Sequence, residues 1–150
     1  MQMRKSLSLV LAVLVWVVSP SCSWAETYQV KMLNRSSTGP MSFEPDYLAL
    51  KPGDKIQFLA STSGHNAASI VGMAPEGAPP FKGKVNEEIV VEFAPKGFYG
   101  IQCMPHYGMG MVMLIQVGDT SLDQVVIPDA VPDAAKKRFL QIMERVKAKK

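Results

Sequence analysis

Short stretches of alternating polar and apolar residues fill the middle of the chain, from Tyr28 to Val117. Turn-forming glycine, proline and aspartate residues separate these stretches about every eight to twelve positions. The alternating or extended stretches are 28–33, 43–50, 55–60, 88–93, 98–102 and 112–117. Such a pattern predicts an all-β fold of about seven short strands, arranged as a sandwich or a barrel.

The pattern changes after residue 120. Pro132 and Asp133 are typical of the first turn of a helix, and a shorter helical turn is predicted within 122–127. The residues that then recur at three- and four-residue spacing are Ala135, Phe139, Ile142, Met143 and Val146. An apolar stripe of this width favours a helix that packs on the sheets over a membrane or partner helix. Residues 71–84, rich in proline and glycine, are predicted to form a long loop.

Residues 1–25 have the pattern of a secretory signal peptide. Two basic residues precede an apolar run from Leu7 to Val18, and small residues then occupy the −3 and −1 positions of a cleavage site after Ala25. The apolar run is shorter than the about 20 residues that a membrane-spanning helix needs. A cleaved signal is therefore favoured over an uncleaved anchor, and we expect a periplasmic protein with no membrane attachment after cleavage.

Composition and charge narrow the class of protein. Hydrophobic residues make up 47% of the chain and charged residues 19%, which is typical of a folded globule and excludes a disordered chain or a coiled coil. Loss of the signal peptide lowers the formal net charge from +3 to +1. Lysine and arginine do not alternate with aromatic residues, so nucleic-acid binding is disfavoured.

Cleavage of the signal peptide also leaves Cys103 as the only cysteine. A single thiol in an oxidising compartment is open to unwanted oxidation unless a metal binds it.

The candidate chemistry lies in residues 103–111, CMPHYGMGM. Cys103 offers a thiolate, His106 an imidazole and Met111 a thioether, in a loop between two predicted strands. His65, the only other histidine, follows a predicted strand and can reach the same end of a sandwich. One thiolate, two imidazoles and a weak thioether are the ligands of a blue copper site. We therefore predict one copper ion per chain.

Met109 is the only serious competitor of Met111 as the fourth ligand. Met109 lies so soon after His106 that the intervening loop is too short, and Met113 is expected to point into the sandwich. Without the Cys–His spacing, Met111 itself would be interpreted as an ordinary core residue. With that spacing, Met111 is the favoured ligand.

The ligand set favours electron transfer over catalysis. Soft sulfur ligands stabilise Cu(I), whereas imidazole serves both oxidation states. No ligand position is left open for a substrate, unlike in a catalytic zinc site. We predict a soluble one-electron carrier that cycles between Cu(II) and Cu(I), and not an enzyme.

A nucleophilic Cys103–histidine pair is the enzymatic alternative, and it lacks an obvious orienting residue beyond Asn66. A periplasmic copper chaperone or storage protein is the remaining alternative.

At this level of detail the sequence resembles a small cupredoxin over essentially the whole exported chain. The resemblance is carried by the loop 103–111, the C-terminal helical extension and the short motifs at 32–34, 43–45, 52–54, 64–66 and 75–78. It implies a cupredoxin-type Greek-key β-sandwich of seven to eight strands. The plastocyanin-like domain would then span 26–120, and the helical extension packed on it would span 121–150.

The same resemblance implies the roles of individual residues. His65, Cys103, His106 and Met111 match the copper ligands of the family. The backbone amide of Asn66 matches the group that is hydrogen-bonded to the cysteine sulfur and tunes the reduction potential.

The resemblance also implies where redox partners dock. Family members present the edge of an exposed histidine ligand within an apolar patch, ringed by lysines. Here the patch would lie around His106 and include Met41, Pro105 and Met109. Two positions of the lysine ring hold the uncharged residues Ser63 and Gln102, and Met104 replaces a usually polar residue. Relatives deliver electrons to copper-containing nitrite reductase or another periplasmic oxidoreductase, and we expect a monomer.

Overall fold

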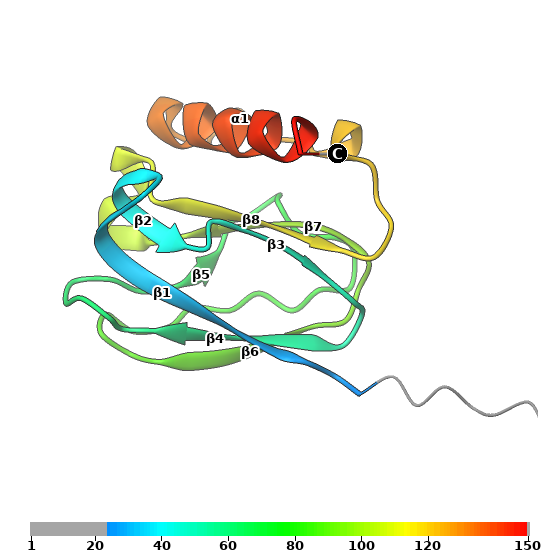
Figure 1. The fold of residues 1–150 in the computed structure, drawn as a ribbon, viewed down its shortest axis with the longest axis horizontal. Helices are drawn as coiled ribbons and strands as arrows, with labels where there is room; N and C mark the ends of the chain where they lie inside the picture. The colour runs from blue at the N-terminus through cyan, green and yellow to red at the C-terminus, as the bar shows by residue number, and fades with distance from the viewer. Residues whose placement is uncertain (1–23, 150) are drawn as a thin grey trace, which may run out of the picture.

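The alternating stretches of the sequence form two four-stranded sheets that pack face to face (Figure 1). The computed structural model describes residues 24–149, and within this range the chain forms eight strands. The first sheet has the order β2 (Gly39–Glu44), β1 (Thr27–Ser36), β4 (Asp54–Leu59), β6 (Ile89–Phe93). The second has the order β3 (Tyr47–Leu50), β8 (Val112–Val117), β7 (Gly97–Gln102), β5 (Ala68–Ser69). The predicted all-β sandwich is confirmed, and the two separate sheets exclude a barrel.

The predicted signal peptide occupies residues 1–25, and its residues 1–23 lie outside the described part of the chain. Strand β1 begins at Thr27, so cleavage after Ala25 would leave the whole strand in the exported protein. Among residues 24–149, no helix is both long enough and apolar enough to cross a bilayer.

Strand β4 shows how alternation places a residue in the core. Ile56 and Phe58 are buried between the sheets, while the side chains between them face partly to solvent, because successive side chains of a strand point to opposite faces. Asp54, at the start of the strand, is buried as well. Its carboxylate accepts hydrogen bonds from the backbone N–H groups of Glu26, at 2.9 Å, and Lys51, at 2.8 Å. This buried charge is therefore compensated by backbone donors.

The stretch 43–50, predicted as one extended segment, is instead two strands in different sheets. Strand β2 ends at Glu44 and β3 begins at Tyr47. Pro45 has no N–H with which to continue the β2 ladder, and the chain crosses to the other sheet there. Apolar residues stand on both sides of this corner, so the segment was predicted as continuous although Pro45 and Asp46 interrupt it. The two-residue strand β5 is likewise too short to show an alternation, and the sequence did not predict it.

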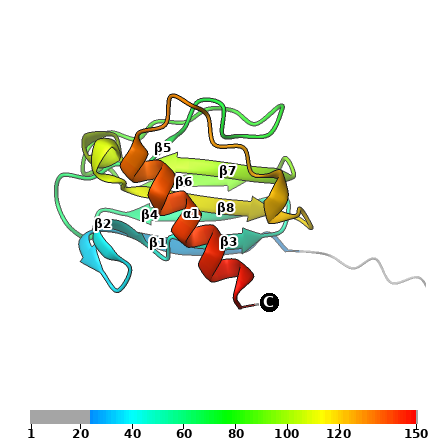
Figure 2. The ribbon, with the colours of Figure 1, turned by 90° about the horizontal axis from the view of Figure 1, so that it is seen from above.

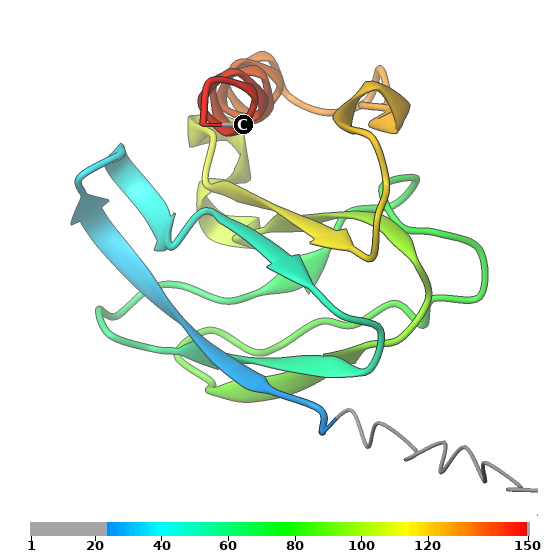
Figure 3. The ribbon, with the colours of Figure 1, turned by 45° about the vertical axis from the view of Figure 1, so that its right-hand side comes forward.

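The C-terminal helix α1 (Asp133–Lys147) lies across the outer face of the sheet that contains β8 (Figures 2 and 3). Its residues Ala135, Phe139 and Ile142 are fully buried and share a cluster with Leu114 of β8. All six residues of β8 are buried, because one face of the strand packs in the sandwich and the other packs under the helix. The predicted helix and its apolar stripe are thus confirmed, and the shorter turn is the 3₁₀ helix η2 (Leu122–Gln124).

A buried tyrosine makes the stability of this fold sensitive to alkaline pH. The Tyr99 hydroxyl donates a 2.7 Å hydrogen bond to the carbonyl of Pro95, and burial raises the pKa of Tyr99 from 10.0 to about 12. A raised pKa in the folded state means that the contribution to stability is complete below pH 10 and is lost as the pH rises towards 12. We expect the free energy of unfolding to fall by about 2 kcal/mol over this interval.

Urea unfolding at a series of pH values measures this loss, and Tyr99→Phe removes the titrating group. The variant should lose less stability than the wild type between pH 10 and 12. Part of the slope should remain, because burial also raises the pKa of Tyr47 and of Tyr107. Superimposable pH profiles for the two proteins would show that Tyr99 does not cause the alkaline loss.

Candidate metal centre

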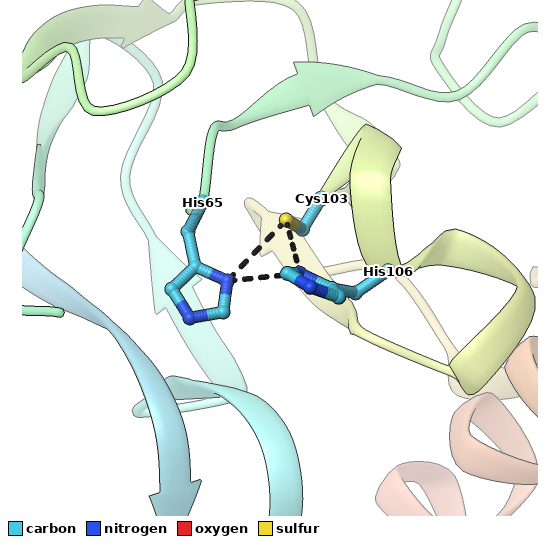
Figure 4. Close-up of side chains that lie close together, drawn as sticks. All are labelled: His65, Cys103 and His106. Carbon is cyan, nitrogen blue, oxygen red and sulfur yellow. Dashed lines mark hydrogen bonds between the residues drawn. The ribbon is translucent and has the colours of Figure 1, made fainter. Parts of the chain in front are cut away.

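Three metal-ligating side chains converge at one end of the sandwich (Figure 4). His65 comes from the loop between β4 and β5, and Cys103 and His106 come from the connection between β7 and β8. The Cys103 Sγ lies 3.6 Å from Nδ1 of His65 and 3.5 Å from Nδ1 of His106. The two Nδ1 atoms are 3.1 Å apart. The structure therefore brings together three of the four residues predicted as ligands, one of them from a distant part of the sequence.

The backbone of the loop 103–111 brings the fourth predicted ligand back to the cysteine. The N–H of Cys103 donates to the carbonyl of Met111 at 3.0 Å, and the N–H of Met111 donates to the carbonyl of His106 at 3.2 Å. Between Cys103 and Met111, the chain forms the 3₁₀ helix η1 (Met104–Met109). The side chain of Met111 is fully buried and belongs to the same apolar cluster as Cys103.

Gly110 allows this tight loop to form next to helix α1. Its φ of +86° lies in the left-handed region that favours glycine. A Cβ atom at this position would lie 2.8 Å from the carbonyl oxygen of Ala134, in the first turn of α1. The helix therefore packs directly against the loop that carries Cys103, His106 and Met111.

Asn34 of β1 sets the orientation of the His65 ring. Its side-chain Oδ1 lies 2.8 Å from Nε2 of His65, and because an amide oxygen only accepts, Nε2 carries the proton. The lone pair of His65 is then on Nδ1, which faces Cys103 and His106. Burial, with a smaller contribution from His106, lowers the pKa of His65 and so favours the neutral, metal-binding imidazole.

Asn66 links three loops around the cysteine. Its Oδ1 accepts the N–H of Met104 at 2.8 Å, and its Nδ2 donates to the carbonyl of Gly83 at 2.9 Å. Burial raises the pKa of the Cys103 thiol, while the backbone amides of Asn66 and His106 act in the opposite direction. The Asn66 side chain thus holds the residue that follows Cys103, while the contact of the Asn66 amide with the cysteine sulfur stays a prediction from the family resemblance.

No role for Asn34 was predicted from the sequence, although the short motif 32–34 contains the residue. Its function depends on a contact across 31 positions of sequence, between β1 and the loop after β4. A single asparagine in a strand carries no signal of such a contact, and only the folded structure assigns it.

The donor set fits a copper ion. Two imidazole nitrogens 3.1 Å apart can both contact one metal ion, since metal–nitrogen bonds in proteins are about 2.0–2.1 Å long. The cluster of described residues contains a soft thiol and imidazoles and no carboxylate, which suits copper and not magnesium or calcium. His65, Cys103 and Met111 have no exposed surface, whereas His106 is half-buried.

A two-sheet sandwich with such a His–Cys–His cluster at one end defines the class of the cupredoxins, the small blue copper proteins. Residues 30–118 match the family model described as copper binding proteins of the plastocyanin/azurin family. The chain belongs to this family, and the relatives with which it groups are pseudoazurins.

The relatives support this grouping over most of the chain. The chain is 41% identical over 132 residues to a putative pseudoazurin of Rhizobium leguminosarum bv. viciae, covering 87% of each protein. It is 42% identical over 114 residues to the pseudoazurin of Paracoccus pantotrophus, covering 76% of this chain and 77% of the relative. The crystal structure of pseudoazurin from Methylobacterium extorquens AM1 matches with a TM-score of 0.74 and 41% identity, covering 81% of this chain and 99% of that one.

These similarities confirm the predicted cupredoxin fold and the prediction of copper as the cofactor. They also confirm the coarse function: pseudoazurins are blue copper electron carriers, and this chain is one of that group.

Proposed function

We propose that His65, Cys103, His106 and Met111 hold one copper ion and that the chain carries single electrons with it. The observation that carries this proposal is the convergence of the two Nδ1 atoms and the cysteine sulfur, none more than 3.6 Å from another. Bound copper supplies the one-electron chemistry by changing between Cu(II) and Cu(I).

The remaining residues keep the donors in place whichever oxidation state is present. Asn34 fixes the His65 ring and Asn66 ties the cysteine loop to its neighbours. The apolar cluster around Cys103 and Met111 excludes water, and the half-buried His106 provides the route for electrons to the surface. A site whose donors do not move on electron gain or loss favours fast and reversible transfer.

The visible spectrum and voltammetry of the copper-loaded protein test the proposal. We expect an intense blue colour in the oxidised protein from thiolate-to-copper charge transfer, loss of this colour on reduction, and a reversible one-electron wave. A copper chaperone or storage protein would bind Cu(I) and show no such colour. A colourless Cu(II) protein would therefore contradict the electron-carrier proposal.

Replacement of the proposed thioether ligand in Met111→Gln should change the reduction potential. A harder oxygen donor favours Cu(II), so the potential should fall. We expect a fall of at least about 59 mV, which for a one-electron couple is a tenfold shift between the two oxidation states. Met113→Leu is the matched control, because Met113 is equally buried but lies outside the proposed ligand set. An equal or higher potential for Met111→Gln would remove Met111 from the set.

We also propose that the protein is exported to the periplasm, with the signal peptide cleaved after Ala25. The exported monomer would consist of the cupredoxin domain, 26–120, and the helical extension, 121–150. The pattern of residues 1–25 and the start of β1 just beyond them support this division.

The proposed docking surface for redox partners is the patch around His106. Pro105 and Met109 are exposed, Met41 is half-buried, and His106 is the only proposed ligand with exposed surface. We propose a periplasmic oxidoreductase as the partner, such as a copper-containing nitrite reductase. Electron transfer across this patch needs close apolar contact, which excludes water between the two proteins.

A charge at the edge of this patch should slow electron exchange. Met41→Lys places an ammonium group in the apolar contact, and we expect the second-order rate constant to fall about tenfold, equivalent to about 1.4 kcal/mol. Stopped-flow mixing with a copper-containing nitrite reductase measures the rate. Leu140→Lys, which adds the same charge at an exposed position of α1, should leave the rate nearly unchanged. Equal rates for Met41→Lys and the wild type would refute the placement of Met41 in the patch.

A further inference from the structure

The way into the proposed copper site passes the edge of His106. His65, Cys103 and Met111 have no exposed surface, so an ion that reaches them from solvent first meets the half-buried imidazole. Two methionines lie at the two ends of η1, which is kinked at His106: Met104 is 43% exposed and Met109 is 57% exposed. The other methionines of residues 24–149 are buried or half-buried.

Hydrogen bonds hold the backbone at both methionines. The N–H of Met104 is fixed by the side chain of Asn66 at 2.8 Å, directly after the buried cysteine. Met109 is enclosed in a turn in which the N–H of Gly110 donates to the carbonyl of Tyr107 at 3.0 Å. His106 lies two residues after Met104 and three before Met109, so two exposed thioethers flank it along the chain.

Sulfur distinguishes these two residues from an ordinary apolar surface. A thioether is a soft ligand that binds Cu(I) well and Cu(II) poorly. Leucine would provide the same apolar area for partner docking with fewer rotatable bonds, and it would not expose a residue that is readily oxidised. Two exposed thioethers on the loop that carries three proposed ligands therefore indicate a function that requires sulfur.

We propose that Met104 and Met109 form an entry site that captures Cu(I) and passes it by way of His106 to the buried Cys103. This inference rests on the proposed function, because it assumes that Cys103 and His106 are ligands of the resident copper. The metal remains Cu(I) throughout, so no electron is transferred. Cys103 releases its thiol proton to solvent as the sulfur binds, since a thiolate is the ligand form.

The rate of loading of the metal-free protein tests the entry site. Anaerobic Cu(I) is supplied as its coloured bicinchoninate complex, and loss of the complex's absorption reports transfer to the protein. In the variant Met104→Leu/Met109→Leu, both sulfurs are removed while volume and apolar surface are nearly conserved. We expect loading by Cu(I) to be about tenfold slower, which corresponds to about 1.4 kcal/mol lost from the transient complex.

Two comparisons make this result specific to the sulfur atoms. Loading with a Cu(II) salt should proceed at the wild-type rate, because thioethers contribute little to Cu(II) binding. Met143→Leu, which removes a half-buried thioether on α1, should load Cu(I) at the wild-type rate. Unchanged Cu(I) loading in the double variant would overturn the entry site, as would equal slowing with both ions, which would indicate a disturbed loop.

The final spectrum separates this inference from the function on which it rests. After complete loading and oxidation, the double variant and the wild type should show the same blue absorption and the same reduction potential. An intact blue spectrum with unchanged Cu(I) loading would overturn the entry site alone. Loss of the blue spectrum in the wild type would overturn both the entry site and the proposed ligand set.

Discussion

Cys103→Ser should give a folded protein that does not form a blue copper site. The substitution replaces the buried sulfur by a hydroxyl of similar shape, and the intense visible absorption requires the thiolate as electron donor. The Cys103 Sγ faces the Nδ1 atoms of both His65 and His106. Cys103 is the only cysteine among residues 24–149, so no other described side chain can supply the thiolate. We therefore expect complete loss of the charge-transfer band.

The visible spectrum after addition of Cu(II) measures this loss, and two observations control for folding. The circular dichroism of the metal-free variant should match that of the metal-free wild type. Copper should also raise the melting temperature of the wild type much more than that of the variant, since a ligand stabilises the state that binds it. Blue absorption of normal intensity in the serine variant would show that Cys103 is not a ligand.

Phe139→Ala should cause the largest loss of stability among single changes in α1. Phe139 is fully buried between the helix and the sheet that contains β8, in the cluster with Leu114. Truncation of a buried phenylalanine to alanine costs about 3–5 kcal/mol, through lost burial and the cavity that remains. The free energy of unfolding of a domain is about 5–15 kcal/mol, so this is a large fraction of the total.

Urea unfolding of the metal-free proteins measures the loss, and Leu140→Ala is the control. Leu140 is adjacent in sequence but 53% exposed, so its truncation should cost less than about 1 kcal/mol. A cost below about 1 kcal/mol for Phe139→Ala as well would show that the helix contributes little to the stability of the sandwich.

Phe139→Ala can also affect the metal centre, because helix α1 supports the ligand loop. The first turn of α1 approaches Gly110 of the ligand loop so closely that a Cβ there would meet the Ala134 carbonyl at 2.8 Å. The helix is thus a support for the loop that carries Cys103, His106 and Met111. Such a contact between the C-terminal extension and the site was not predictable from the apolar stripe, which indicates only that one face of the helix is covered.

The metal centre was predictable to the extent that its signals are local. Cys103, His106 and Met111 lie within nine residues, and the types and spacing of their side chains indicate a soft metal site before any fold is known. His65 could be added because the chain contains no other histidine. Its partner Asn34 could not be added, because the hydrogen bond joins two elements that are distant in sequence and nothing near Asn34 in the chain indicates it.

By itself, the sequence determined the class of fold, the C-terminal helix and the chemistry of the candidate site. These depend on periodicity and on short-range spacing, which the chain carries locally. The tertiary structure alone decided that 43–50 divides between two sheets, that Asn34 orients His65, and that Met104 and Met109 remain exposed while Met111 is buried. Each of these depends on which distant segments pack together, and a residue's neighbours along the chain do not specify its neighbours in space.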